Sequence, residues 1–525
     1  MNATIPSGCA CCPLNRRTFI ARTGLAASGV LGLAPGSAIL ARAAEASNTK
    51  DQTKVRLIFA LHSSQQSVPD WPNKGFDFVP IMDRIQNELT RRCPDFEFVR
   101  TLAAGPEQAK AVLSEDQQAG GIDGYVVHQM NCWNQVVQTI ADSGKPVLYA
   151  DFQFGGSGGF LVYNAAFLRS ATPNVGFVAS SEVADLAAAV RCIADAKRPG
   201  RARDFASLTA RVRAHSTPNA NSRLGADDDL RCVPTQECLG LMKTSRILAV
   251  RDQTSGDEPA IAGVPVRRVP FSELNQAWEQ ADRDEARAVA DRWTQAADRV
   301  EGVTRETLET SAAMYLAEKA VMKKYSANAI TINCLGGFYG GHIHAYPCLG
   351  FHQLLNDGTV GGCECDVRSA ATLVIGNLLT SGRPGYISDP VMNTAKREIV
   401  YAHCVAANRA LGPRGPANRY EILTHSEDRQ GASVRSFLPV DRLTTSLQFD
   451  QGRKEILFHQ ARAVGNDPDD RACRTKLCAE PLGDFEKLFT QWDRWGWHRV
   501  TFYGDLKQPI YALADALGWK VIEEA

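Results

Sequence analysis

The length and composition of the chain describe a globular protein of several domains. Its 525 residues are 44% hydrophobic and 22% charged, and a chain of this size buries a large core in about two to four domains. Lysine plus arginine and aspartate plus glutamate both number 58, so no net charge attracts nucleic acid or an anionic membrane. We therefore expect a small, neutral partner and no nucleic acid.

Residues 1–45 have the form of a twin-arginine export signal. Arg16 and Arg17 precede a moderately apolar stretch at 23–40, and the sequence Ala-Arg-Ala at 41–43 offers a cleavage site. Glycine and proline interrupt the apolar stretch, which argues against a stable membrane anchor. We expect a periplasmic or secreted protein that crosses the membrane already folded.

The cysteines leave the question of disulfides open. Cys9, Cys11 and Cys12 belong to the predicted signal, so 12 of the 15 cysteines remain after cleavage. An oxidising compartment would allow some of them to pair, although the connectivity cannot be read from spacing. Two candidate pairs lie close in sequence: Cys232 with Cys238, and Cys473 with Cys478.

The segment 54–178 has the pattern of an α/β domain. Apolar runs at 55–61, 124–127 and 145–150 predict strands, and stretches at 107–118 and 134–142 predict the helices between them. The order β-α-β-α-β implies a parallel, Rossmann-like sheet. A run of four glycines around Ser157 follows the third strand; no nucleotide-binding motif accompanies it, so it predicts a flexible loop near a pocket mouth.

Two more domains are expected after it. Residues 179–378 predict a second Rossmann-like α/β domain, in which Pro265 marks the run 264–269 as an edge strand. Its helices are predicted at 273–299 and 304–325. Residues 379–525 predict an α+β domain with a β-barrel-like part, because several alternating runs precede a final helix at 510–517.

Two carboxylates flank one predicted helix in the stretch 347–389. Glu364 follows a glycine-rich apolar run, as at the end of a buried strand, and Asp389 ends another strand-like run after the helix at 369–379. Side chains at the ends of adjacent strands can converge on one pocket. Glu364 and Asp389 are therefore a candidate pair for metal binding and proton transfer.

Histidines continue this pattern. His403 follows an apolar run and His498 abuts another, whereas His342 and His344 flank the same region at a spacing that suits either chelation or hydrogen bonding to a substrate. Asp366 has an alternative, purely structural role as the N-cap of the helix. Cys363 and Cys365 are expected to be packed thiols, because neighbouring side chains of an extended chain point to opposite sides.

The order of these residues resembles the L-fucose isomerase and L-arabinose isomerase superfamily. The motif Cys-Glu at Glu364, the acid Asp389, the motif His-Cys at His403, and Trp497-His498 with a Gly-Asp pair shortly after follow the superfamily order. An aspartate as the second acid is the fucose type. One departure is Trp497, which stands where arabinose-type enzymes carry the first of two histidines.

The resemblance implies a metal-dependent enzyme that interconverts an aldose and a ketose through a cis-enediol. It implies Mn²⁺, or another divalent ion such as Mg²⁺, held by Glu364, Asp389, His498 and His403, with the two acids also moving protons. His342 and His344 remain candidates for substrate contact. It also implies a homo-oligomer, a trimer or hexamer. The alternative is an exported sugar-binding or sensing protein that uses the same scaffold without turnover.

Overall fold

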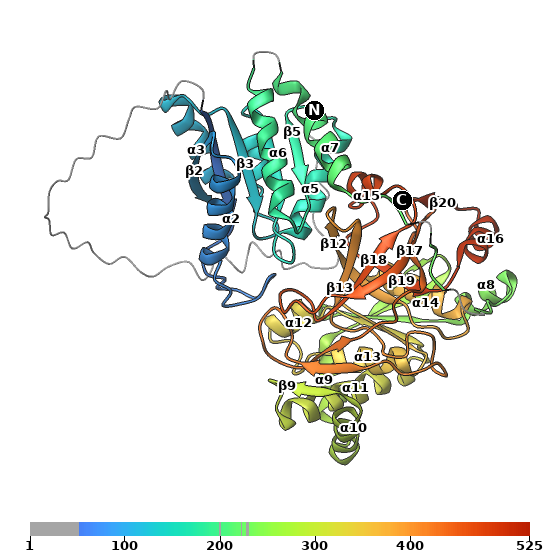
Figure 1. The fold of residues 1–525 in the computed structure, drawn as a ribbon. Coiled ribbons are helices and arrows are strands. Elements are labelled where there is room, and N and C mark those ends of the chain that lie inside the picture. The colour runs from blue at the N-terminus through green and yellow to red at the C-terminus, as the bar shows by residue number, and fades with distance from the viewer. Residues whose placement is uncertain (1–51, 199–200, 222, 227–229) are drawn as a thin grey trace, which may run out of the picture.

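The computed structural model describes residues 52–198, 201–221, 223–226 and 230–525. The predicted export signal lies outside the described residues. Figure 1 follows the chain from a first sheet in blue and cyan, through a second sheet in green and yellow, to a barrel in orange and red. Within the described ranges, no helix is both long and apolar enough to span a bilayer.

The first sheet is wholly parallel. Its strand order is β2-β1-β3-β4-β5, which is the order of flavodoxin-like doubly wound sheets and not that of the dinucleotide-binding Rossmann fold. Its strands are β1 (Thr53–Ala60), β2 (Phe96–Ala103), β3 (Gly124–Gln129), β4 (Val147–Asp151) and β5 (Val175–Val178). Ligands of such sheets bind beyond the carboxyl ends of the strands.

Helices cover both faces of this sheet, because its buried side chains alternate between two cores. Val55, Leu57 and Phe59 face one core, and Ile58 and Ala60 face the other. The helices are α2 (Val79–Arg92), α3 (Pro106–Ala119), α4 (Val136–Ala141), α5 (Ser157–Arg169), α6 (Val183–Ala196), η2 (Ala202–Asp204) and α7 (Phe205–Ser216). Because α6 and α7 pack on this sheet, the first unit extends beyond residue 178.

The second sheet is parallel except for one edge. Its order is β11-β10-β6-β8-β7, with β6 (Ile247–Val250), β7 (Gly256–Ile261), β8 (Val264–Val269), β10 (Ala329–Ile332) and β11 (Val360–Gly362). Its helices are α8 (Thr235–Thr244), α9 (Phe271–Glu279), α10 (Arg283–Ala296), α11 (Arg305–Lys324), α12 (Cys334–Tyr339), α13 (Cys348–Asn356) and α14 (Val367–Leu379). The single helix predicted at 273–299 is therefore two helices, α9 and α10.

The predicted edge position of the strand at 264–269 was wrong. This strand, β8, lies between β6 and β7, and the antiparallel strand β7 forms the edge. The pairing of β7 with β8 loses its regular register between Glu258 and Ile261, which is the stretch of β7 opposite Pro265. A local irregularity of this kind accommodates a residue that has no N–H to donate.

The last unit contains a closed barrel, as predicted. The strands close in the cycle β16-β19-β12-β13-β18-β17-β16, and β20 adds to β17 outside the cycle. They are β12 (Tyr386–Asn393), β13 (Glu398–His403), β16 (Leu443–Asp450), β17 (Glu455–Asn466), β18 (Thr475–Pro481), β19 (Arg499–Tyr503) and β20 (Lys520–Glu523). A small sheet of β9 (Arg299–Glu301), β14 (Tyr420–Leu423) and β15 (Ser433–Ser436) and the helices α15 (Phe485–Gln491) and α16 (Lys507–Leu517) complete the unit.

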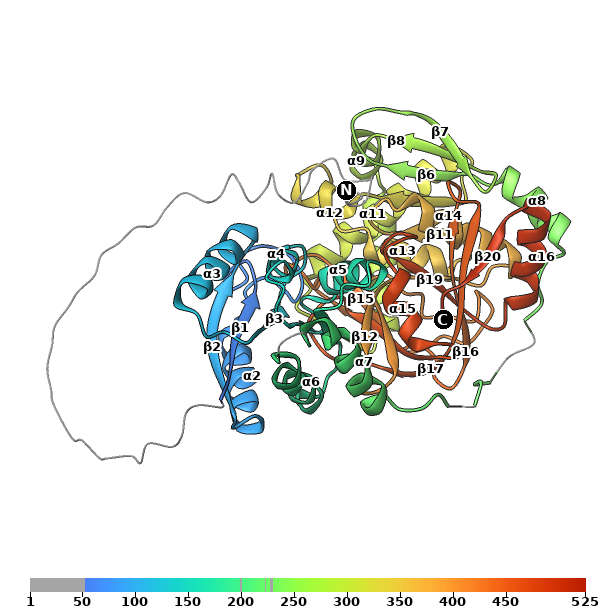
Figure 2. The same cartoon turned by 90° about the horizontal axis from the view of Figure 1, so that it is seen from above.

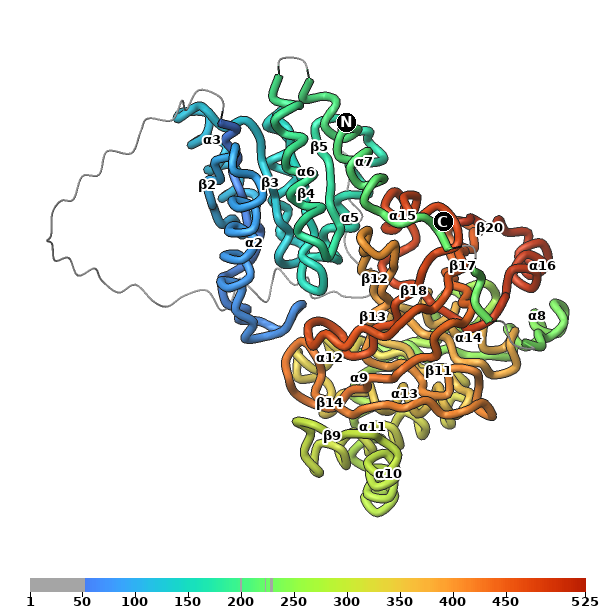
Figure 3. The backbone as a smooth tube through the Cα atoms, in the orientation of Figure 1, coloured from blue at the N-terminus to red at the C-terminus, as the bar shows by residue number. Residues whose placement is uncertain are grey.

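The first unit docks on the barrel through α5, α7 and α15, which lie together in Figures 1 and 3. Arg213 donates to Glu486 at 2.7 Å, and Arg169 pairs with Asp493. The loop after β1 reaches the same side, because the amide of Lys74 donates to the carbonyl of Glu427. In the view from above, α16 and α8 lie on the opposite side of the molecule from α3. Gln153, just after β4, donates to the carbonyl of Met392 on β12, so the carboxyl edge of the first sheet faces the barrel.

Helix α14 lies directly against the barrel, and a glycine makes this contact possible. A Cβ atom at Gly376 would stand 2.1 Å from the ring of Phe502 on β19. The helix is buried along almost its whole length. This packing places the N-terminus of α14, and the acids that precede it, beside the end of β19.

Candidate metal centre

Glu364, Asp389, His403 and His498 come together at one end of the barrel, and we call them the tetrad. One ligand atom from each residue lies within 4.8 Å of those of the other three. The strands explain this convergence: β12, with Asp389, lies between β13, which ends at His403, and β19, which His498 precedes. Glu364 arrives from the end of β11. The predicted convergence of acids and histidines is thus what the structure shows.

The distances within the tetrad leave room for an ion between the side chains. Nε2 of His498 lies 3.2 Å from Oδ1 of Asp389 and 3.8 Å from Oε2 of Glu364. Nε2 of His403 lies 3.9 Å from Oε1 of Glu364. Both histidines and Asp389 are buried, whereas the Glu364 side chain is 35% exposed. The tetrad is therefore open on the side of Glu364.

The backbone at Glu364 is held in an unusual conformation. Glu364 and Cys365 have φ of 61° and 52°, the left-handed region that glycine prefers. Each such residue costs on the order of 1–3 kcal/mol, and such strain gathers at functional sites. Here the two left-handed residues turn the chain sharply between β11 and α14 and direct the Glu364 carboxylate toward the histidines.

Asp366 connects helix α14 to the tetrad. One carboxylate oxygen caps the helix by accepting from the amides of Arg368 and Ser369, as predicted. The other oxygen lies 2.9 Å from Nδ1 of His498. A carboxylate at Nδ1 places the ring proton on that nitrogen and leaves the lone pair of Nε2 free for a metal. Asp366 therefore both starts the helix and orients His498.

His403 has a different hydrogen-bonding arrangement. The backbone amide of Cys404 donates to Nδ1 of His403 at 3.0 Å. A neutral imidazole that accepts at Nδ1 carries its proton on Nε2. In this tautomer His403 presents an N–H toward Glu364, so it is a hydrogen-bond donor in the tetrad and a weaker candidate ligand than His498.

Electrostatics in the tetrad favour a charged His498. Burial by itself lowers the pKa of His498, but the hydrogen bond to Asp366 and the nearby carboxylates of Asp389 and Glu364 outweigh burial and raise the pKa well above its ordinary value. Burial would raise the pKa of Asp389, and the neighbouring His498 lowers it instead. The pKa of Asp366 is lowered for the same reason. Positive charge is therefore favoured at this position.

The donor atoms fit a divalent metal ion. Nε2 of His498 is buried and has no hydrogen-bond partner, and a buried nitrogen of this kind needs an explanation such as an ion. Carboxylate oxygens combined with imidazole suit ions such as Mn²⁺. No cysteine belongs to the tetrad, and the 12 cysteines among the described residues are free thiols.

His342 and His344 lie against helix α9. The ring of His342 stacks on Phe271 with centroids 5.4 Å apart, and the ring of His344 lies 5.0 Å from that of Trp278. Neither belongs to the tetrad. Their role in substrate contact stays a prediction.

Tryptophans from two units adjoin the tetrad, and the sequence did not single out this wall. Trp497 precedes His498, and its indole helps to lower the pKa of Asp389. The ring of Trp133, from the loop after β3, lies 6.3 Å from that of Trp497 and is 41% exposed. Gly158 at the start of α5 lies beneath both rings. The predicted glycine loop is thus partly the first turn of α5, packed under this aromatic wall.

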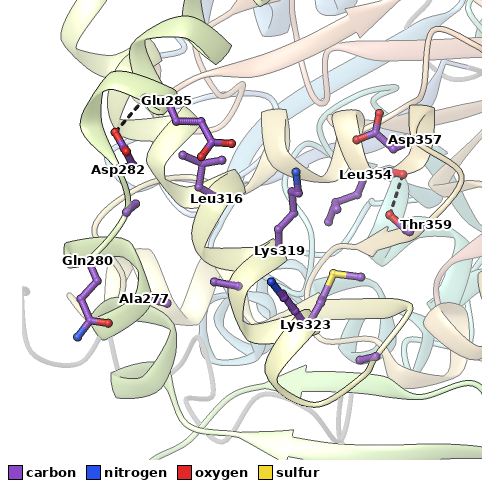
Figure 4. Close-up of a pocket in the computed structure, with 14 residues that line it drawn as sticks. Ala277, Gln280, Asp282, Glu285, Leu316, Lys319, Lys323, Leu354, Asp357 and Thr359 are labelled. Carbon is purple, nitrogen blue, oxygen red and sulfur yellow. Dashed lines mark hydrogen bonds between the residues drawn. The ribbon is translucent and has the colours of Figure 1, made fainter.

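A separate hollow lies among the helices of the second unit. It has a volume of about 790 Å³ and is lined by residues of α9, α11 and α13 and the loops beside them. Figure 4 shows Lys319 and Lys323 extending from α11 into it, with Asp282, Glu285 and Asp357 around them. No residue of the tetrad lines it.

Comparisons with known proteins point to sugar isomerases. A sulfoquinovose isomerase from Clostridium sp. (strain MSTE9) is 25% identical over 265 residues, which are 49% of this chain and 57% of that protein. One from Alkalicoccus urumqiensis is 30% identical over 97 residues, 18% of this chain and 22% of that protein. The chain therefore matches less than two thirds of either relative. This similarity supports the predicted relationship to sugar isomerases.

No family model matches the chain. Among solved structures, a solute binding protein of an ABC transporter from Bacillus halodurans with bound myo-inositol is 13% identical and covers 63% of this chain and 91% of that chain. Its TM-score is 0.17, too low to support any argument about fold or function.

Proposed function

We propose that the protein is a metal-dependent aldose–ketose isomerase that acts on a sugar through a cis-enediol. The observation that carries this proposal is the tetrad, in which two carboxylates and two buried, unpartnered imidazole nitrogens face one another at the end of the barrel. The similarity to sulfoquinovose isomerases supports it independently. A sugar-binding protein would have no need to bury the carboxylate of Asp389 beside two imidazoles.

Glu364, Asp389 and His498 would hold the ion, and Mn²⁺ is the first candidate. A divalent ion in this position supplies Lewis acidity, which stabilises negative charge on the carbonyl and hydroxyl oxygens of an open-chain sugar. Asp366 keeps His498 in the tautomer that leaves Nε2 free. His403, whose Nε2 carries a proton, would donate to a substrate oxygen instead of binding the ion.

The two acids differ in their freedom to move protons. Asp389 is buried and engaged by His498 and Trp497, so it is mainly a ligand. Glu364 stands at the open side of the tetrad and can reach the carbon next to the carbonyl. We assign to Glu364 the removal of that proton and its return to the adjacent carbon. His403 would donate its Nε2 proton to the carbonyl oxygen and take up the proton of the neighbouring hydroxyl as the ketone forms.

The substrate would lie between the tetrad and the aromatic wall of Trp133 and Trp497. Indole faces cover the C–H surface of a sugar, while the polar end of the molecule meets the tetrad. Sulfoquinovose is the first sugar to test, because the relatives are named for it, and L-fucose is the second. We also propose export through the signal at 1–45 and assembly into a trimer or hexamer.

The direct test is turnover in deuterated water. Purified protein loaded with Mn²⁺ should convert sulfoquinovose or a related aldose to its ketose and incorporate solvent deuterium at the carbon that was the aldehyde of the aldose. Glu364→Gln should abolish conversion, whereas the matched control Glu523→Gln, at an exposed carboxylate that pairs with Lys507, should convert the sugar like the wild type. Sugar binding without conversion in the loaded protein would favour the sugar-binding alternative and contradict the isomerase.

A further inference from the structure

A buried ion pair lies inside the barrel, and it involves no residue of the tetrad. Arg499, the first residue of β19, donates to Glu524 through Nε at 3.1 Å and through an Nη nitrogen at 2.6 Å. The side chains of Arg499 and Glu524 are 0% and 1% exposed. Burying two charges costs desolvation energy, and removing either partner would leave the other charge buried and unpaired.

The remaining donors of Arg499 hold the segment that carries His498. Its Nη nitrogens donate to the carbonyl oxygens of Trp492 at 2.8 Å, Gly496 at 3.1 Å and His498 itself at 3.0 Å. Its guanidinium also lies 4.0 Å from the centre of the Trp492 ring. A planar guanidinium with five donors can make all these bonds only in one orientation, and Glu524 sets that orientation.

The same carboxylate begins a chain of hydrogen bonds toward the strand of His403. Nδ1 of His459 lies 3.0 Å from Glu524, and Nε2 of His459 contacts the hydroxyl of Tyr401. Tyr401 stands two residues before His403 on β13, and Ser446 donates to its hydroxyl. The network therefore reaches both strand ends that present the histidines.

We propose that Glu524 is a positioning residue of the metal centre. It acts through Arg499, which fixes the carbonyls on both sides of Trp497 and so fixes the place of the His498 ring. Glu524 touches neither the ion nor the substrate. This inference rests on the proposed metal-dependent function and adds a residue more than 130 positions from Asp389, on a segment outside the barrel cycle.

The test is Mn²⁺ affinity, measured by the electron paramagnetic resonance signal of free and bound Mn²⁺ in the full-length protein. Glu524→Gln should weaken Mn²⁺ binding by about tenfold or more, as outer-shell partners of ligands do, and should broaden the bound signal. Glu523→Gln is the matched control, because this neighbouring carboxylate is exposed and pairs with Lys507. It should bind Mn²⁺ like the wild type.

A second variant tests whether the geometry of Arg499 matters apart from its charge. It also keeps the proposal testable if Glu524→Gln folds poorly. Arg499→Lys keeps a positive charge beside Glu524 but cannot reach three carbonyls, so it should also weaken Mn²⁺ binding and broaden the signal. Thermal melting without metal reports stability. Lowered stability in both variants with wild-type Mn²⁺ affinity would overturn the positioning role. A wild type that binds no Mn²⁺ would overturn the proposed function, and this role with it.

Discussion

Asp366 caps helix α14 and also orients His498, and a single substitution can separate these two roles. Asn caps a helix about as well as Asp, so Asp366→Asn should preserve the start of α14. The amide cannot support a charged His498 or hold its ring proton equally well. We predict a 10–100-fold loss of Mn²⁺ affinity with a change in melting temperature of only a few degrees. Calorimetric Mn²⁺ titration and thermal unfolding measure the two effects.

The two histidines of the tetrad have different partners at Nδ1, so we expect metal binding to depend on His498 and not on His403. His498→Ala removes a nitrogen whose lone pair is free, so the purified variant should lose its metal. His403→Gln replaces a donor at Nε2 with an amide donor, so the variant should retain metal and lose turnover. Metal analysis of both proteins measures this difference. Equal metal loss in the two would show that His403 is a fourth ligand.

The raised pKa of His498 predicts how metal binding depends on pH. In the metal-free protein His498 holds a proton above its ordinary pKa of 6.5, and an ion must displace it. Affinity should therefore rise by about tenfold per pH unit until pH passes the raised pKa. Without metal, the stabilising charge on His498 is fully present below pH 6.5 and is lost as pH rises through the raised pKa. Titrations and melts over a pH series test both trends.

The residues of the tetrad were predictable from the sequence, and their supports were not. Glu364, Asp389, His403 and His498 each end or adjoin an apolar run, which is why the sequence singled them out. In the structure Asp389 lies within β12 and not at its predicted end, and Glu364 comes from a different sheet. The bond from Asp366 to His498 joins residues 132 positions apart. Such a pairing depends on the barrel closing, which no local pattern expresses. The tautomer of His403 could not be predicted from the sequence either, because it depends on one hydrogen bond from the backbone amide of Cys404.

Among the elements, α14 depends most on a single small side chain. Gly376→Ala would place a methyl group against the ring of Phe502, although alanine is the better helix former. We predict a net destabilisation of about 1–3 kcal/mol, the usual cost of overpacking. Chemical denaturation of the metal-free variant measures it. Ala370→Gly is a contrasting change in the same helix: it removes a buried methyl group instead of adding one, and lost helix propensity and lost burial together should cost about 2 kcal/mol.

Most elements followed from periodicity, and the exceptions have physical causes. Three strands of the first sheet were visible as short apolar runs, and parts of the barrel as alternating ones. The two edge strands of the first sheet, β2 and β5, were not predicted. Pro265 misled the prediction of an edge strand because an irregular pairing with β7 accommodates it. The glycines around Ser157 look like a loop, but buried packing against Trp133 and Trp497 holds them at the start of α5. At Pro265 and at the glycines around Ser157, tertiary contacts therefore decided the structure against the local sequence preference.

At the scale of the whole molecule, three units meet at one place. The second sheet and α14 bring Glu364 and Asp366, the barrel brings Asp389 and both histidines, and the first unit brings Trp133 from the carboxyl edge of its sheet. Ligands bind at such edges in open α/β sheets. The arrangement therefore encloses a candidate site that no single unit could form.

The measurement that tests this account most directly is the metal content of the folded protein, by mass spectrometry after purification without added chelator. We predict about one divalent ion per chain, mainly manganese or another ion that prefers carboxylate and imidazole ligands. The Glu364→Gln variant should lose this ion and stay folded. A wild-type protein that holds no divalent ion, even after incubation with Mn²⁺, would contradict a metal centre at the tetrad and the isomerase that depends on it.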